Sequence, residues 1–568
     1  MKRTVENLAE RSYDLIVIGG GIYGSCVAWD AALRGLSVAL VEQGDFGHAT
    51  SANSQKIVHG GFRYLQHADI RRMRESIRER KILMRVAPHL VHPLPCVLPT
   101  VRTGLYRRTS MRLALACYDL VAWDRNVGIE DPQKQIPRGR IVSRDECLRL
   151  APGMSDPEIT GGAVWHDGQI YNSERLTLAF LRAAADQGAC LANYVKVIGF
   201  LQEGRHILGV RAQDALTGQV MEVRGRMVVN TAGPWVSRVL GLAHQSQPTA
   251  HKPLSKTVNL ITTRVLTHGH AVSVALPRRQ GLRGQDTGDR RLYLTPWRGR
   301  TIIGSAHIVF RDDPDACQVT AEDIEGLLAD VNTAYPGAAL TREEISFVHL
   351  GLIPFEDRDG SGNPAQLSRC YQIRDHQDDG LEGLISVEGV KYTTARDVAQ
   401  KVVDRVMRQL GFRPVPSRSA ATPVAGGHIA SFERYLAAVL RERPHGLDED
   451  IVRQLVYAYG SDYAQVLKVA ANQADWLQRV SSASPVIKAQ VAYAVREELA
   501  QTLQDVVLRR TELGTLGSPG REALEVCADV MAQEMGWSRQ RIERELEETE
   551  QAFARILAQP LQAGAGQR

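Results

Sequence analysis

The sequence lacks the features that mark several large classes of protein. No 18 uncharged apolar residues follow one another, so no membrane-spanning helix is predicted. The first residues, MKRTVENLAERSYD, contain no apolar segment of the kind that a signal peptide needs. We therefore expect a chain that stays in the cytoplasm.

Cysteine pairs and a strong net charge are also absent. The eight cysteines are scattered and form no CxxC pair, so neither a metal site nor a dithiol redox site is predicted. The net charge is only +5 over 568 residues. An excess this small does not indicate a nucleic-acid partner.

What is present is the composition of a large globular protein. Hydrophobic residues make up 44% and charged residues 23% of the chain, and the length gives about three or four domains. Residues 146–190 predict mostly helix, whereas 193–232 and 255–310 favour strands. After about residue 428, apolar side chains recur at helical spacing, for example at Ile451 and Leu455, and Ser538 is a predicted helix N-cap.

The N-terminal part has the pattern of a dinucleotide-binding βαβ unit. An apolar run at 14–18 predicts a buried strand, GGGIYG follows at 19–24, and 25–34 is compatible with a helix. Gly19 permits the tight turn, Gly21 lets the backbone approach a pyrophosphate, and Gly24 lets the helix pack closely. Glu42 ends the second apolar run, where a carboxylate can bind ribose hydroxyls.

Further motifs identify the family that this chain resembles. They are ATSANSQKIVHGGFRYL at 49–65, VNTAGPWV at 229–236, ISVEGVKYTTAR at 385–396 and a C-terminal stretch from 489 to 546. With the glycine fingerprint, these resemble the FAD-dependent glycerol-3-phosphate dehydrogenase family, within the D-amino-acid-oxidase-like flavoproteins.

The resemblance implies an α/β protein with three parts. An FAD-binding Rossmann-like domain would comprise 12–250 and 356–412, with a β-rich substrate domain of α+β character inserted at 251–355. A linker at 413–428 would lead to an all-helical C-terminal domain at 429–560.

The resemblance also implies which residues hold a noncovalent FAD. The residues expected to contact it are Gly19, Gly21, Gly24, Glu42, Thr50, Ser51, Ser54, Val197, Ala232, Gly233, Gly389, Val390 and Lys391. Lys391 and the backbone beside it would meet the pyrimidine edge of the flavin, where negative charge develops on reduction.

The substrate pocket follows the family in part. The family surrounds a small anionic alcohol with arginines, and this chain keeps Arg63, Tyr64 and Arg369 as expected substrate contacts. It departs from the family at three further pocket positions: Ile353 stands where an arginine is usual, Asn259 where a histidine is usual, and His307 in the family's Gly-Thr-Thr-Asp motif. The substrate is therefore glycerol 3-phosphate, with another donor compensating, or a relative with less charge or a larger substituent.

Oxidation of an alcohol requires a base that takes up the hydroxyl proton while a hydride passes to the N5 atom of the flavin. The histidines near motif positions are His307, His59 and His349, and His307 is the first choice because it lies in the substrate-domain motif. Together with Lys391, His307 and His59 are the predicted catalytic residues.

One basic segment of the sequence bears on the electron acceptor. Residues 105–123 form a basic, apolar, helix-compatible segment, which suits either an anionic membrane surface or an ordinary amphipathic surface helix. We expect a quinone-linked dehydrogenase bound peripherally to the inner face of the membrane. An oxygen-using oxidase and a flavin-binding protein without turnover remain as alternatives, and homodimer formation is left open.

Overall fold

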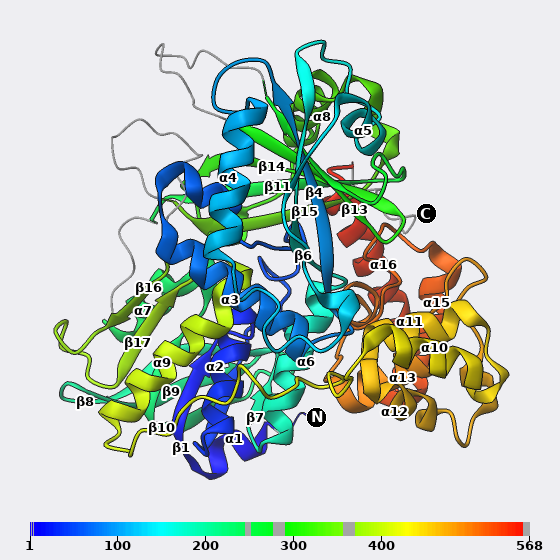
Figure 1. Cartoon of the computed structure of the whole chain (residues 1–568). Coiled ribbons are helices and arrows are strands. Elements are labelled where there is room, and N and C mark those ends of the chain that lie inside the picture. Colours follow the sequence, from blue (N-terminus) through cyan, green and yellow to red (C-terminus); the bar gives the residue numbers. More distant parts are fainter. Residues whose placement is uncertain (2, 4, 245–251, 277–289, 356–369, 560–568) are drawn as a thin grey trace.

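The computed structural model describes residues 1, 3, 5–244, 252–276, 290–355 and 370–559 (Figure 1). This part of the chain forms two mixed β-sheets and a C-terminal group of helices. In Figure 1 the first sheet lies at the lower left, the second above it, and the C-terminal helices at the right in yellow, orange and red. The expected α/β class with a β-rich part and a helical C-terminal domain is confirmed.

The first sheet has eight strands and is parallel at its centre. β1 (Ser12–Ile18) lies between β2 (Val38–Val41) and β10 (Val220–Asn230), parallel to both. β7 (Cys190–Ala192) extends the sheet beyond β2, and β17 (Leu384–Glu388) extends it beyond β10, again in parallel. The antiparallel additions are β8 (Val195–Glu203), β9 (His206–Asp214) and β16 (Gln372–Asp375). The carboxyl ends of β1, β2, β10 and β17 therefore meet at one edge.

A buried helix follows β1 directly. α2 (Ile22–Leu33) packs between α6 (Ser173–Asp186) and α9 (Ala395–Gln409) against the first sheet. Its sequence IYGSCVAWDAAL is apolar on every side, as expected of a helix that is surrounded by protein. Trp29 of α2 meets Phe180 of α6 edge to face, with ring centroids 5.2 Å apart.

The second sheet has nine strands. Near one edge, β11 (Leu254–Thr262) pairs antiparallel with β14 (Arg300–Phe310) and with the edge strand β15 (Ile345–Pro354). The sheet continues from β14 through strands that come from two regions of the chain, which are β13 (Arg291–Trp297), β12 (Ala271–Ala275), β4 (Val91–Val101), β6 (Ile159–Ile170), β3 (Ile57–Val58) and β5 (Arg140–Val142). Segment 251–355 thus supplies five of the nine strands, and the other four precede residue 171.

The helix predicted across 146–190 is wrong in its middle. α5 (Arg144–Leu150) and α6 are helical, but Ile159–Ile170 is the long strand β6, which pairs with β4 along its whole length. Three glycines in ITGGAVWHDGQI disfavour a helix, and the pairing with a strand some 70 residues earlier decides the outcome.

Two helices pack against the part of the second sheet that contains β5 and β6. α3 (Ile70–Val86) and α4 (Arg108–Val121) contact each other and β6. The helix expected within 105–123 is therefore confirmed, with its buried side formed by Met111, Leu115 and Tyr118. None of the described helices combines the length and the apolar character that crossing a bilayer requires.

The C-terminal helices pack around a core that also includes side chains of the second sheet. The longer of these helices are α10 (Phe432–Glu442), α11 (Glu449–Tyr459), α13 (Lys488–Glu498), α15 (Arg521–Met535) and α16 (Arg539–Ile556). Ile451 and Leu455 of α11 are buried in this core, and Ser538 caps α16 by accepting a hydrogen bond from the Arg541 N–H at 3.3 Å. The helical periodicity and the N-cap read from the sequence are confirmed.

A buried ion cluster joins this domain to the first sheet. Asp45, three residues after Glu42, accepts hydrogen bonds at 2.7 and 2.6 Å from Arg510 and a further one from Arg509. Burial opposes ionisation of Asp45, but the two guanidinium charges outweigh it and hold the pKa of the carboxyl well below its usual range. The C-terminal domain therefore fixes the loop that follows β2.

Candidate active site

A cavity of about 1580 Å³ is lined by residues from both sheets. It begins at the carboxyl edge of the first sheet and reaches the strands β11, β14 and β15 of the second. Its volume exceeds the roughly 300–1,000 Å³ of ordinary small-molecule sites. The space suits a long ligand together with a second, smaller one.

The glycine turn after β1 is shaped for close approach of a ligand. Gly19 has a φ of +103°, and a Cβ on Gly24 would lie 1.9 Å from the Gly19 carbonyl oxygen, so both positions require glycine. Gly21 differs, because a Cβ there would approach only the Ser51 Oγ, at 3.1 Å, before reaching the cavity. Gly19 and Gly21 line the cavity, whereas Gly24 lies beneath it in the packing of α2. A phosphate could therefore lie against the start of α2.

Glu42 lies on the cavity wall at the end of β2. Its carboxylate accepts hydrogen bonds from the Gly20 N–H at 2.7 Å and the Gly44 N–H at 2.9 Å. These bonds fix both carboxylate oxygens and leave each with a further lone pair. Val197 on β8, and Ala232 and Gly233 after β10, line the same cavity.

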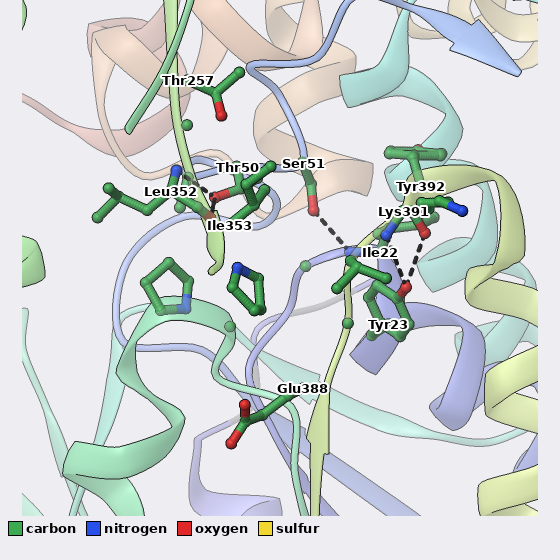
Figure 2. Close-up of a pocket in the computed structure, with 18 of the residues that line it drawn as sticks. Ile22, Tyr23, Thr50, Ser51, Thr257, Leu352, Ile353, Glu388, Lys391 and Tyr392 are labelled. Atoms are coloured by element: carbon green, nitrogen blue, oxygen red, sulfur yellow. Dashed lines mark hydrogen bonds between the residues drawn. The ribbon is translucent and has the colours of Figure 1, made fainter. Parts of the chain in front are cut away.

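The segment with Thr50, Ser51 and Ser54 also lines the cavity. Figure 2 shows that the Ser51 Oγ accepts a hydrogen bond from the Ile22 N–H, at 3.0 Å, and that Thr50 bonds to the backbone of Leu352. Thr50 donates to the Leu352 carbonyl at 2.9 Å and accepts from its N–H at 3.2 Å. These hydroxyls therefore connect the glycine turn to β15.

Tyr23, which lies inside the glycine motif and was not expected from the sequence, organises the loop after β17. Its hydroxyl donates to the Lys391 carbonyl at 2.8 Å and accepts from the Lys391 N–H at 3.2 Å (Figure 2). A Cβ on Gly389 would lie 2.1 Å from the Tyr23 ring, so the loop passes directly over it. Gly389, Val390 and Lys391 all line the cavity. The sequence did contain a signal for this role, because Tyr23 is a tyrosine at one of the variable positions of the GxGxxG motif.

Cationic side chains gather where the cavity meets the second sheet. The Lys391 Nζ donates a hydrogen bond to the Tyr64 hydroxyl and lies 4.2 Å from the centroid of its ring. Burial lowers the pKa of Lys391 to about 8, so the ammonium is mostly charged at neutral pH. Arg63 and Arg291 line the same region, and Arg291 was not expected from the sequence.

The three positions that depart from the family lie on neighbouring strands. Asn259 is on β11, His307 on β14 and Ile353 on β15, and all three line the cavity. Ser255 of β11 pairs with Ile353, and its hydroxyl lies 3.2 Å from the His307 Nδ1. The Asn259 Oδ1 accepts a hydrogen bond from the Ser305 hydroxyl at 2.7 Å.

The histidines differ in environment. Burial, followed by the charges of Arg63 and Arg290, lowers the pKa of His307 to about 4. His349 is buried against Trp297 and Phe347, away from the cavity.

His59 lies on the cavity wall with 44% of its side chain exposed. Its Nδ1 lies 3.9 Å from the Asp167 Oδ2, and its backbone N–H donates to the Thr393 hydroxyl at 3.2 Å. Among the predicted substrate contacts, Arg369 lies outside the described residues. The structure thus brings His59, His307, Arg63, Tyr64 and Lys391 to one cavity.

Two family models match the sequence. Residues 14–384 match FAD dependent oxidoreductases, and residues 417–542 match the C-terminal domain of alpha-glycerophosphate oxidase. A glycerol-3-phosphate dehydrogenase of Synechocystis is 31% identical over 556 residues, which is 96% of this chain and 97% of that one. A mitochondrial glycerol-3-phosphate dehydrogenase of Mus musculus is 30% identical, over 96% of this chain and 73% of its own.

The solved structures give the same likeness. The glycerol-3-phosphate dehydrogenase from Bacillus halodurans, complexed with FAD, is similar with a TM-score of 0.78 at 27% identity, over 98% of both chains. An L-alpha-glycerophosphate oxidase from Mycoplasma pneumoniae shares the fold, with a TM-score of 0.52 at 15% identity over 73% of this chain and 99% of that one.

Proposed function

This chain belongs to the FAD-dependent glycerol-3-phosphate dehydrogenase family, and we propose that it oxidises the secondary alcohol of sn-glycerol 3-phosphate to dihydroxyacetone phosphate. The observation that carries the proposal is the shared cavity. One end has the glycine turn and Glu42 of a dinucleotide site, and the other end has the cations Arg63 and Lys391.

FAD fits the residues that are present. Gly21 leaves open space at the start of α2, and Glu42 offers carboxylate lone pairs at the end of β2. Bound FAD supplies the hydride acceptor at its N5 atom. The ammonium of Lys391 would face the pyrimidine edge and stabilise the negative charge that arises there, and no covalent attachment is needed.

The end of the cavity that would hold the substrate must bind its anionic group and provide a base for its hydroxyl proton. Arg63, Lys391 and Arg291 are the cations that would hold the phosphate, because a dianion needs several donors at once. We propose His59 as the base, since its Nδ1 lies near a carboxylate while its ring faces the cavity. His307, with a pKa of about 4, is a weak base at neutral pH and serves better as a neutral hydrogen-bonding partner.

The test is anaerobic reduction of the bound flavin. Glycerol 3-phosphate should bleach the flavin absorbance of the holoenzyme within a turnover, whereas glycerol without phosphate should not. A panel of polyol phosphates and glycerophosphodiesters, measured in the same way, distinguishes the simple substrate from a larger relative. Failure of every alcohol in the panel to bleach the flavin would contradict the proposed oxidation.

We further propose a membrane quinone as the electron acceptor and the outer face of α4 as the docking surface. Leu113, Leu120 and Trp123 are 67%, 75% and 75% exposed, although they are large and apolar. Arg108 and Arg112 are exposed on the same helix. A helix with apolar side chains facing outward and arginines beside them suits an anionic lipid surface.

The double substitution Leu120→Asp with Trp123→Asp is expected to weaken binding to vesicles that contain phosphatidylglycerol by at least about tenfold, since two large apolar side chains no longer enter the lipid. Flavin reduction by substrate should not change. Leu216→Asp, at a 42% exposed leucine between β9 and β10, is the matched control. Unchanged sedimentation of the double variant with vesicles would contradict the docking surface.

Stoichiometric peroxide release in air without quinone would favour oxygen as the acceptor.

Position 353 tests how the anion is recognised. Ile353→Arg adds a guanidinium to the cavity beside Ser255 and His307. If glycerol 3-phosphate is the substrate, kcat/KM should rise by up to about one to two decades, because a charged hydrogen bond contributes about 1.5–3 kcal/mol. If the natural substrate carries a substituent there, kcat/KM on the best phosphodiester should fall.

Ile308→Arg provides the control for this experiment, because Ile308 is on β14 next to His307 but does not line the cavity. Equal efficiencies of the Ile353→Arg and parent proteins on both substrates would mean that position 353 does not face the substrate.

A further inference from the structure

We infer that Asp167 is a positioning residue for the proposed base: its carboxylate holds the proton on the Nδ1 of His59, so that the Nε2 can accept the substrate proton. The inference rests on the proposed alcohol oxidation. Asp167 was not among the residues that the sequence suggested, because it lies on β6, about a hundred residues from the HGG motif that contains His59.

The carboxylate of Asp167 is held from several directions. Its Oδ1 accepts hydrogen bonds from the Gly60 N–H at 2.6 Å and from the Arg80 Nη1 at 3.3 Å. Its Oδ2 accepts one from the Trp165 indole N–H at 3.2 Å and lies 3.9 Å from the His59 Nδ1. The Oδ2 therefore faces the imidazole, while the Oδ1 is bound by hydrogen-bond donors inside the protein.

Asp167 remains an anion despite its burial. Burial opposes ionisation, but the nearby imidazole of His59, the charge of Arg80 and the Gly60 N–H together lower the pKa of this carboxyl below its usual value. Arg80 is itself buried, and it donates to the His166 carbonyl at 2.6 Å and to the Tyr118 hydroxyl at 3.1 Å. The arginine is thus fixed behind the carboxylate.

The other titratable groups around this pair are mostly neutral at pH 7. Burial raises the pKa of Cys96 on β4, of Tyr118 on α4 and of Tyr293 on β13. Burial, followed by nearby positive charge, lowers the pKa of His166 to about 4. Arg63, Arg291 and Lys391, which line the same cavity, bring positive charge to this region.

A carboxylate beside one ring nitrogen has two effects on an imidazole. It favours the tautomer with hydrogen on that nitrogen, and it stabilises the protonated ring, which raises its proton affinity. The 3.9 Å separation is an ion-pair distance that is longer than a hydrogen bond. Contacts of this kind commonly shorten when substrate is bound. The surroundings of His307 are opposite in charge, because the Ser255 hydroxyl and the positive charges of Arg63 and Arg290 are nearby.

The experiment uses the FAD-loaded Asp167→Asn protein, because asparagine keeps the shape and removes the charge. Under anaerobic conditions, the first-order rate of flavin reduction by glycerol 3-phosphate at pH 7 should fall about tenfold or more. The apparent substrate constant and the FAD content should change less than about threefold.

Two further variants make the result specific. In a His59→Gln background, Asp167→Asn should cause no additional loss, because the residue it positions is already gone. Asp124→Asn is the matched control. Asp124 pairs with Arg74 and Lys81 of α3, the helix that also carries Arg80, and it does not line the cavity. This control should reduce its flavin at the parental rate.

A readout without turnover separates this inference from the proposed function. Nitrogen-15 NMR of labelled histidine, with His59→Gln identifying the signal, should show the His59 tautomer with hydrogen on Nδ1 in the parent and less of it in Asp167→Asn. An unchanged tautomer, or a changed tautomer with an unchanged rate of flavin reduction, would overturn the positioning role. A changed tautomer in a protein whose flavin no alcohol reduces would contradict the proposed oxidation alone.

Discussion

Replacement of Gly21 by valine is expected to give a folded protein that retains almost no FAD. Gly21 has φ of −76°, which valine adopts without strain, and a Cβ there would approach only the Ser51 Oγ before it enters the cavity. The isopropyl group would occupy the space at the start of α2 in which the pyrophosphate must lie. The apoprotein should therefore be intact while the cofactor is excluded.

The measurement is the ratio of flavin to protein after purification, together with the melting temperature of the apoprotein. Gly326→Val in α8 (Ala321–Ala334) is the control, because a Cβ at Gly326 meets no atom within 4 Å. That variant should retain a full complement of FAD. A normal flavin content in the Gly21→Val protein would show that the pyrophosphate does not lie against this turn.

A His59→Gln holoenzyme is expected to reduce its flavin about 10²–10⁴-fold more slowly with glycerol 3-phosphate, which is the usual contribution of a general base. Glutamine can still hydrogen-bond but cannot take up the hydroxyl proton at neutral pH. The glycine turn and Glu42 are unaltered, so the FAD content should equal that of the parent.

Rapid mixing under anaerobic conditions measures the first-order rate at saturating substrate. The control is His206→Gln, at a histidine on β9 whose side chain is 66% exposed and pairs with Glu382. If the rate of flavin reduction falls less than a few fold in His59→Gln but falls strongly in His307→Gln, then His307 is the base.

Residues that cooperate within one short stretch of sequence could be predicted better than residues that lie far apart in it. The glycine turn and Glu42 fall within one contiguous βαβ unit, whose strand, turn and helix each have a local signature. That unit could be predicted in detail. Tyr23 lies in the same motif and could have been singled out, but its partner Lys391 is 368 residues away.

Long-range pairing explains what the sequence did not reveal. β6 is a strand because β4 pairs with it, and the residues of 159–170 alone do not indicate this. Asp167 takes its place beside His59 only through that strand, so no local pattern could identify it. Asn259, His307 and Ile353 were expected near one pocket by family likeness, and the pairing of β11 with β14 and β15 provides the physical reason.

The link between Asp45 and Arg510 has a consequence for the order of events during protein synthesis. Asp45 leaves the ribosome early, and the guanidinium group that neutralises it is made 465 residues later. Until then Asp45 lacks the two guanidinium groups that neutralise it in the folded protein. We therefore expect the loop behind Glu42 to be fixed in place, and FAD to be retained, only once Arg510 has been made. A chain that ends before Arg510 should be cleaved by proteases in this loop more readily than the full chain.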